Sequence, residues 1–302
     1  MKQIKSLIAR RKIYDGVFAV IGVLALMVGL ITLAALMIDL AMDGLARLSP
    51  AFFTSYTSRF PGKAGILAAW VGTVAVMFST ALVAVPLGVA AGIYLEEYAR
   101  KNWILNAIEI NIANLAGVPS IVYGLMALGI FVYTFHLGQS VLSGGLTLAL
   151  LILPIVIIAT REAIRAVPVS VREAAVAMGA TKWQTIRDHV LPYSGGGIIT
   201  GIIMALSRAI GETAPLITIG ALTFIAFLPP SPVQTTPPFI SFDWLTSLFT
   251  VMPIQMFNWV SRPQKAFHLN AAAAGLVLMF MTLVMNGLAI YIRYRVRKRI
   301  HW

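Results

Sequence analysis

The chain has 302 residues, of which 59% are hydrophobic and only 11% are charged, and its mean hydropathy is +0.87. Polar side chains are too few to cover a water-soluble globule of this size, so the composition excludes an ordinary soluble domain. The sequence contains no cysteine, which excludes disulfide frameworks, thiolate metal sites and cysteine nucleophiles.

Long apolar runs predict an all-α membrane protein with six transmembrane helices. A bilayer core of about 30 Å needs about 20 apolar residues in helical form, because peptide groups in lipid have no water to bond. The runs of sufficient length are residues 16–38, 64–95, 110–135, 137–160, 193–228 and 269–292. The first run is too long for a cleavable signal and lacks a clear small-residue cleavage site, so we expect it to remain as an anchor.

The placement of lysine and arginine predicts the orientation, since these residues accumulate on the cytoplasmic side. The N-terminus, the second and fourth connections and the C-terminal tail together carry 17 of them, whereas the opposite side carries 5. Both termini are therefore expected in the cytoplasm. The net charge of +12 reflects this bias, aided by attraction to anionic lipid, and nucleic acid is not expected as a partner.

The connection 229–268 is predicted to be an outer loop that begins with a proline-rich turn, residues 229–238. Within it, residues 247–260 are apolar but too short to cross a membrane alone, and Pro253, Gln255 and Asn258 interrupt them. A seventh crossing would also place the basic tail outside. We expect an interfacial helix at 247–260, with a re-entrant segment as the alternative.

The cytoplasmic connection, residues 161–192, contains signals for two short helices. Ser170 and Glu173 have the spacing of a capping box, and Gly179 suits the left-handed residue that ends a helix. Thr181 and Gln184 form a second capping box, which opens another short helix toward His189. The small residues between the boxes fit a surface that binds another protein, and they fit a stiff loop that contacts only its own chain equally well.

Arg208 is a charged residue deep in the fifth apolar run. It lies about 22 Å along a helix that starts at Tyr193, and a lone charge inside a bilayer costs about 3 kcal/mol. Glu212 is four residues further and can pair with it on one helical face. The pair predicts either a pathway for oxyanions, which match the planar guanidinium, or a structural ion pair between helices.

Signatures of enzymes are missing from the sequence. It contains no phosphate-binding G-x-x-x-x-G-K-[ST] loop, no H-E-x-x-H and no G-x-S-x-G. The four histidines are scattered, without the spacing of metal ligands. Any ATP-driven step is therefore expected on another polypeptide.

Two sets of motifs resemble known membrane permeases. Glu173-Ala174-Ala175, Gly179 and Leu191-Pro192 resemble the EAA loop of ABC importer permeases, which docks on a cytoplasmic ATPase; His189 stands where that family usually has isoleucine. The string S-R-A-I-G-E-T-A-P-L at 207–216 resembles the PstA-type permeases, one of the two membrane subunits of the bacterial phosphate-specific ABC importer. Residues 116–124, 153–154 and 252–259 agree with this resemblance, which extends over 64–292.

The resemblance implies the type I ABC importer permease fold with six transmembrane helices, N-in and C-in. Residues 1–63 would form the cytoplasmic N-terminus, the first helix and an outer linker. Residues 64–292 would form the permease domain, with a coupling loop at 161–192 and a periplasmic loop at 229–268. Residues 293–302 would form a basic cytoplasmic tail.

The same resemblance implies that the chain carries inorganic phosphate across the bacterial cytoplasmic (inner) membrane. The expected partners are a homologous C-type permease in a heterodimer, two ATPase subunits that bind ATP and Mg²⁺, an external phosphate-binding protein, phosphate and membrane lipid. No cofactor or metal is expected on this chain itself. Arg208 and Glu212 would line the pathway, and the residues expected to contact the ATPase are Arg172, Glu173, Ala174, Ala175 and Gly179.

Three alternatives remain open from the sequence. The same architecture could serve another oxyanion, such as sulfate or molybdate, because a single arginine does not distinguish tetrahedral anions. The chain could also be a stand-alone anion channel or an intramembrane enzyme. For Arg172 we weigh an acidic rim on the ATPase against simple exposure to water.

Overall fold

The computed structural model describes residues 2–234 and 239–298, and the side chains of 11–234 and 239–295. Throughout these residues the regular structure is helical, and the only β-type pairings there are two isolated bridges, Ser140 with Leu248 and Val233 with Ile240. The predicted all-α class is confirmed.

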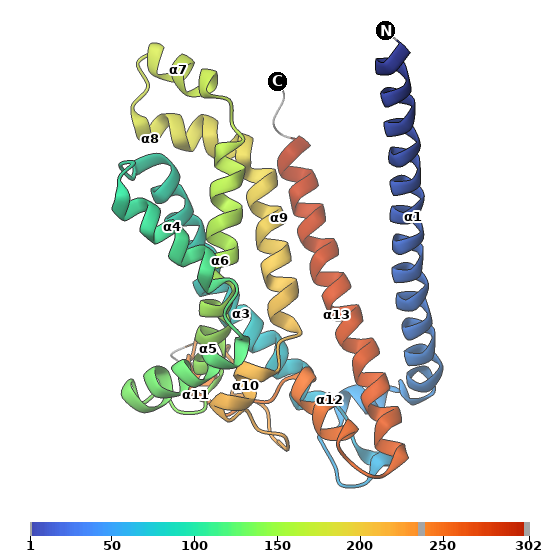
Figure 1. The fold of residues 1–302 in the computed structure, drawn as a ribbon. Coiled ribbons are helices and arrows are strands. Elements are labelled where there is room, and N and C mark those ends of the chain that lie inside the picture. Colours follow the sequence, from blue (N-terminus) through green and yellow to red (C-terminus); the bar gives the residue numbers. More distant parts are fainter. Residues whose placement is uncertain (1, 235–238, 299–302) are drawn as a thin grey trace.

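Five helices are long and apolar enough to cross a membrane once their flanking turns are included. The main parts of these helices are α1 (Lys2–Gly44), α3 (Leu67–Ile93), α6 (Val141–Arg165), α9 (Leu191–Ile210) and α13 (Lys265–Lys298). A broken pair of helices, α4 (Trp103–Leu115) and the segment Ser120–Thr134, which meet at 104°, also passes this test together and counts as a sixth crossing if the pair forms one span. Both described ends of the chain lie at the same end of the bundle (Figure 1), as an even number of crossings requires.

Shorter elements connect the crossings. On the outer side these are η1 (Leu45–Arg47), α2 (Pro50–Thr54), η2 (Pro61–Lys63), α10 (Ala214–Ile219), α11 (Asp243–Thr246) and α12 (Met252–Val260). On the cytoplasmic side they are η3 (Tyr94–Tyr98), α7 (Val169–Ala177), α8 (Lys182–Thr185) and η5 (Ile186–Val190). The segment that follows α4 is formed by α5 (Ser120–Ala127) and η4 (Leu128–Thr134). The segments η3, η4 and η5 are π-helical and prolong their neighbouring helices.

Small residues set the close packing of the bundle around α6. Gly88 and Gly92 of α3 lie directly against Val156 and Thr160 of α6, and Gly201 of α9 lies against Ala159. Without a hydrophobic driving force between helices in lipid, such close backbone approach is a main source of helix association. The most apolar window of α6 is accordingly 67% buried, far more than that of α1, which is 0% buried.

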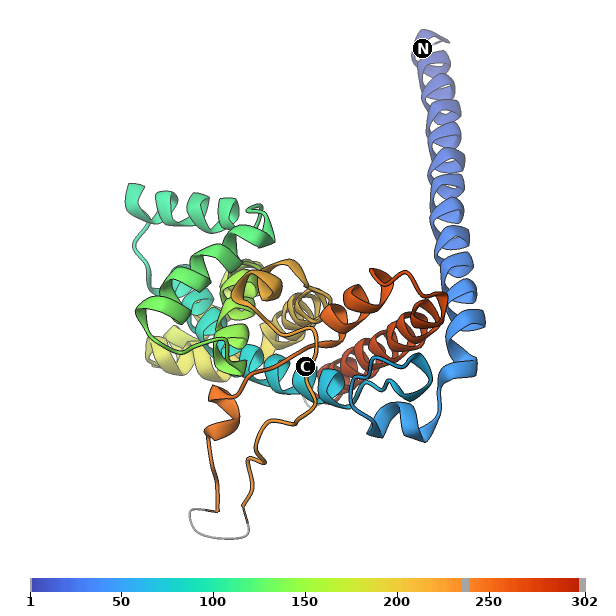
Figure 2. The ribbon, with the colours of Figure 1, turned by 90° about the horizontal axis from the view of Figure 1, so that it is seen from below.

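Helix α1 stands apart from the bundle for most of its length (Figure 2). It contacts the rest of the chain at its outer end, where Gly44 lies against Ala272 and Ala273 of α13. Arg47, just beyond α1, donates hydrogen bonds to Asn270 of α13 and to the carbonyls of Pro61, Gly62 and Ala64. The outer linker is thereby tied to both helices.

The outer segment 247–260 differs from its prediction. Helix α12 forms there, but Met252, Ile254, Gln255 and Trp259 are fully buried inside the chain, and the Met252 N–H donates to Thr73 Oγ1 of α3. The expectation of an interfacial helix with its apolar face in lipid is therefore wrong, because that face packs on protein.

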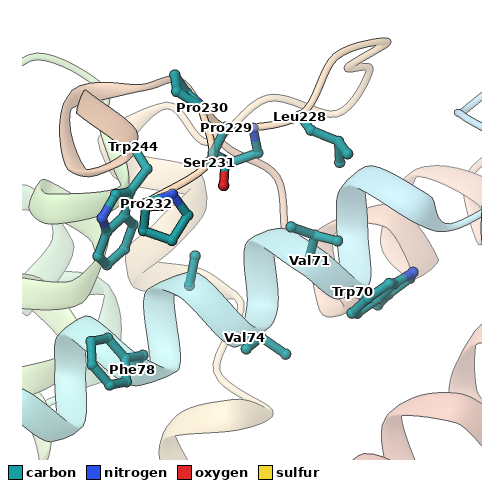
Figure 3. Close-up of a pocket in the computed structure, with 11 residues that line it drawn as sticks. Trp70, Val71, Val74, Phe78, Leu228, Pro229, Pro230, Ser231, Pro232 and Trp244 are labelled. Atoms are coloured by element: carbon teal, nitrogen blue, oxygen red, sulfur yellow. The ribbon is translucent and has the colours of Figure 1, made fainter. Parts of the chain in front are cut away.

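The proline-rich turn runs past the outer half of α3. Pro229, Pro230 and Pro232 line an apolar groove of about 610 Å³, and Figure 3 shows them opposite the α3 side chains Val74 and Phe78. Pro237 and Pro238 of the predicted turn lie outside the described residues.

The contact between α6 and α9 can be tested with two glycines of α9. A methyl group at Gly201 would overlap Ala159, whereas one at Gly196 would have nothing within 4 Å. We expect Gly201→Ala to lower the free energy of unfolding by about 1–3 kcal/mol through overpacking. Gly196→Ala should be neutral, or stabilising by up to about 1 kcal/mol through helix propensity. Thermal unfolding in detergent measures both, and equal midpoints would contradict the packing described.

Candidate functional site

Arg208 lies in the last turn of α9, immediately before this helix ends at Ile210. The apolar run 193–228, predicted as the fifth crossing, is not one helix: α10 begins at Ala214, and the described residues between 221 and 242 contain no helix. Gly211 and Pro215 explain the break. Glycine weakens a helix. Pro215 has no N–H to donate to the carbonyl of Gly211, four residues earlier, so it is tolerated only in the first turn of a new helix, which is where α10 has it.

The position of Arg208 is set by the outer halves of the neighbouring helices. Ala209 and Ile210 line a small internal space together with Thr73 of α3 and Leu148 of α6. Thr73 and Leu148 lie about two turns, or roughly 10 Å, from the outer ends of their helices. Arg208 therefore lies nearer the outer ends of the crossings than their cytoplasmic ends.

The predicted pairing of Arg208 with Glu212 is confirmed, but its geometry differs from the expected one. The Arg208 Nε and Glu212 Oε1 atoms are 3.4 Å apart, and the side chains are 43% and 19% exposed. Because α9 has already ended, the pair bridges the helix break instead of following one helical face. No described residue accepts a hydrogen bond from either terminal nitrogen of Arg208, so most of its fork is available to another acceptor.

Two of the motif strings noted in the sequence lie against each other at this place. Gly124 of α5 is in such close contact with Pro215 and Thr218 of α10 that a side chain there would collide with both. Tyr123, the preceding residue, is close enough to Arg208 to experience its charge, and its hydroxyl donates to the carbonyl of Leu115. The break between α4 and α5 thus faces the break between α9 and α10.

The cytoplasmic loop, residues 161–192, begins with the last turn of α6, and its first separate helix is α7. The predicted capping box of Ser170 and Glu173 does not form: the helix starts two residues earlier than expected, with Pro168 as its N-cap residue and no side-chain cap. The predicted end at Gly179 is confirmed, with φ of +84°. The N–H groups of Gly179 and Ala180 donate to the carbonyls of Val176 and Ala175, which is the bonding pattern of a Schellman cap.

The second predicted helix of the loop begins as expected and continues further. Thr181 and Gln184 form a complete capping box. From Lys182 the helical conformation runs through η5 into α9, ending at Ile210. The π-helical turn lies directly before Pro192, where the missing proline N–H and the bulk of its ring disturb the regular bonding. Helix α8 is therefore the cytoplasmic end of the fifth crossing.

Arg172 points into the chain, which differs from both sequence-based alternatives. It donates two hydrogen bonds to Glu97 Oε1, at 2.8 and 3.0 Å, and one each to the carbonyls of Ile164 and Val167. Glu97 was not singled out from the sequence, because it lies just after an apolar run and next to a second acidic residue, Glu96, at the edge of the predicted crossing. That acidic pair at the end of a 32-residue helix was the available signal.

The outward face of α7 carries other residues of the motif. Glu173, Ala174, Val176 and Met178 are exposed, and Met178 is the most exposed at 89%. Ala175 is buried against the chain. Helix α7 lies at the end of the molecule opposite α10 (Figure 1), and α10 begins six residues after Arg208, so any effect of one site on the other has to pass along the helices.

Comparison with known proteins identifies the family. The family model of the binding-protein-dependent transport system inner membrane component matches residues 84–301. The chain belongs to this family. It is 33% identical to the phosphate transport system permease protein PstA of Yersinia pestis over 287 residues, covering 93% of this chain and 90% of that protein. It is 31% identical to PstA 1 of Mycobacterium tuberculosis H37Rv over 235 residues, covering 78% and 71%.

Solved structures agree on the fold. A chain of a bacterial alginate ABC transporter gives a TM-score of 0.66 with 14% identity, covering 94% of this chain and 96% of that one. A chain of the inward-facing MetNI methionine ABC transporter gives 0.56 with 15% identity, covering 74% and 93%. The expected type I ABC importer permease fold and the resemblance to PstA-type permeases are both confirmed.

The turn at Gly179 makes a structural prediction. A left-handed conformation costs an ordinary residue roughly 1–2 kcal/mol, and a β-branched one is the least suited to it. Since a Cβ at Gly179 would meet nothing within 4 Å, the backbone conformation alone should decide the result. We expect Gly179→Val to speed hydrogen exchange at the backbone amides of residues 179 and 180 by about tenfold or more. Gly179→Asn should change the exchange rates far less. Equal exchange in both variants would contradict the assigned cap.

Proposed function

We propose that the chain is the membrane permease subunit of an ATP-driven importer that moves inorganic phosphate across the bacterial cytoplasmic membrane. The observation that carries this proposal is Arg208, whose guanidinium has one long ionic contact and free terminal nitrogens at a break between two helices. A planar fork of this kind suits a tetrahedral oxyanion. The PstA relatives, at 33% and 31% identity, favour phosphate over other oxyanions.

Glu212 limits how tightly the site holds its anion. A lone arginine in a low-dielectric environment would bind phosphate strongly and release it slowly. The carboxylate, 3.4 Å from the guanidinium, competes for the same charge and repels the anion. The pair therefore suits brief contact in transit, and not a storage site.

The proposed partners follow from the family. A C-type permease would complete a heterodimer, two ATPase subunits would bind ATP and Mg²⁺ beneath the coupling loop, and an external binding protein would deliver phosphate. The exposed face of α7, with Glu173, Ala174 and Met178, is the surface that we assign to ATPase docking.

Replacing Arg208 tests the pathway. We expect Arg208→Gln to reduce phosphate uptake by about ten- to a hundredfold, the effect of losing one hydrogen bond to a charged partner, while assembly and membrane insertion stay normal. Arg262→Gln is a matched control, because Arg262 lies in the outer loop and donates to Asn258. Uptake of labelled phosphate into proteoliposomes is the measurement. Near-normal uptake by Arg208→Gln would contradict the assignment. Competition by sulfate or molybdate would point to one of these anions as the substrate.

The glycine cap of α7 tests the docking surface. Valine at position 179 does not suit the left-handed conformation with φ of +84°. We therefore expect Gly179→Val to lower the amount of phosphate taken up per ATP hydrolysed by about fivefold or more. Gly179→Asn serves as the control, since asparagine tolerates the left-handed conformation. ATP hydrolysis and phosphate uptake are measured on the same complex. Normal coupling by the valine variant would show that the shape of this turn does not matter for docking.

A further inference from the structure

The π-helical end of α3 contacts each part of the coupling loop with three consecutive side chains. Glu96 pairs with Arg161 and Arg165 at the end of α6, Glu97 pairs with Arg172 of α7, and the Tyr98 ring lies 4.9 Å from Lys182 Nζ of α8. We propose that η3 receives the movement of the coupling loop and passes it to α3, with Glu97 and Arg172 as the positioning pair. This inference rests on the proposed ATP-driven function.

The Glu97–Arg172 contact has the geometry of a rigid connection. Both Nε and one terminal nitrogen of Arg172 donate to the same carboxylate oxygen, and the side chains are 22% and 10% exposed. Hydrogen bonds between ionised groups are short and strong, and partial burial protects them from screening by salt. Both terminal nitrogens of Arg172 also donate to backbone carbonyls where α6 ends, one to Val167 and the other to Ile164. One side chain of α7 therefore fixes two other helices.

The neighbouring contacts keep the two sides of the connection in register. Arg165 donates two hydrogen bonds to Glu96, one to each carboxylate oxygen. Arg161, only 8% exposed, joins Glu96 to Glu109 of α4, with 2.6 Å to the latter. Val171 of α7 also packs on a buried cluster that includes Ile164 and Val190. The base of α7 is thus held on its apolar side as well, and η3 is its ionic contact with α3.

Helix α3 extends from this connection to the surroundings of Arg208. Its cytoplasmic half lies tightly against α6 through Gly88 and Gly92. Its outer half contributes Thr73 and Met77 to the same small internal space as Ala209 and Ile210, the two residues that follow Arg208. A displacement of η3 along or across the helix would therefore change the packing beside Arg208. Only Pro86 interrupts the regular bonding of α3.

The first test compares transport with ATP hydrolysis in the complete complex. Glu97→Gln keeps an acceptor for Arg172 and removes the charge. We expect uptake per ATP hydrolysed to fall by about fivefold or more, with hydrolysis itself near the wild-type rate. Glu162→Gln is the matched control: Glu162 is 64% exposed, and its one ion pair among the described residues is with Arg165, so its uptake per ATP hydrolysed should be unchanged. An unchanged ratio in Glu97→Gln would overturn the proposal.

A second variant separates this role from simple folding. Arg172→Lys keeps the positive charge but cannot serve a carboxylate and two carbonyls with one planar fork. We expect it to assemble normally and to show the same loss of uptake per ATP as Glu97→Gln. If the pair acts as one unit, the double variant is no worse than the Arg172→Lys variant alone. Additive losses in the double variant would overturn the pairing.

The third test reads movement directly and is independent of the substrate. The native chain has no cysteine, so spin labels can be placed at Val169→Cys on α7 and Tyr94→Cys on η3, which are 65% and 61% exposed, with partner subunits free of cysteine. In the complex with native Glu97 we expect one narrow distance, unchanged between nucleotide-free and ATP-bound states. With Glu97→Gln the distribution should broaden or shift on ATP binding.

The outcomes distinguish this inference from the proposed function. A label distance that changes with ATP in the complex with native Glu97 would show that α7 moves independently of η3, whatever is transported. Absence of phosphate uptake from the native complex, combined with a fixed label distance, would remove the phosphate assignment and leave the connection intact.

Discussion

The broken crossings depend on one constraint: a peptide group in lipid has to find its partner within the protein. The chain meets this constraint by placing its two breaks together. Gly124 allows α5 to lie directly against Pro215 and Thr218 of α10, and the Tyr123 hydroxyl donates to the carbonyl of Leu115 at the end of α4. Each break thereby covers part of the other. A charged side chain can then lie at the edge of a helix without facing hydrocarbon on all sides.

The arginines at the two ends of the molecule differ in how fully they are bonded, and this difference separates their roles. Arg172 makes four hydrogen bonds to groups of its own chain, so little of it is left for a ligand. Arg208 has one ionic contact of 3.4 Å and is 43% exposed. In a purely structural ion pair within a membrane, we would expect more of the guanidinium N–H donors to be hydrogen-bonded, because each buried donor without a partner costs free energy there. The bonding of Arg208 therefore favours the transport reading over the structural one.

Several properties that depend on local sequence were predictable, although the Ser170–Glu173 capping box does not form, and those that depend on distant contacts were not. The number of crossings follows from apolar length, and the ends of the coupling turn follow from Gly179 and the Thr181–Gln184 box. An apolar composition continues through the break after Ile210, so hydropathy alone does not locate the end of α9. The burial of α12 and the inward turn of Arg172 were missed because Thr73 and Glu97, their partners, are 179 and 75 residues away in the sequence.

Two routes connect the coupling loop to Arg208. The displacement of one route relative to the other determines how the packing around Arg208 changes. One is the continuous helix from Lys182 to Ile210, which carries Arg208 itself but contains the π-helical turn at Ile186–Val190. The other passes through η3 and α3, which carries Thr73 and Met77 beside Ala209. If both helices moved by the same amount, the surroundings of Arg208 would not change. Both routes contain a π-helical turn, but in different places: η5 lies between α8 and α9, whereas η3 is itself the segment that contacts the loop, and Pro86 lies further along α3. Because these irregular turns are less rigid than a straight helix, the two routes deform differently under the same displacement. That difference turns a movement of the loop into a change of packing at the site.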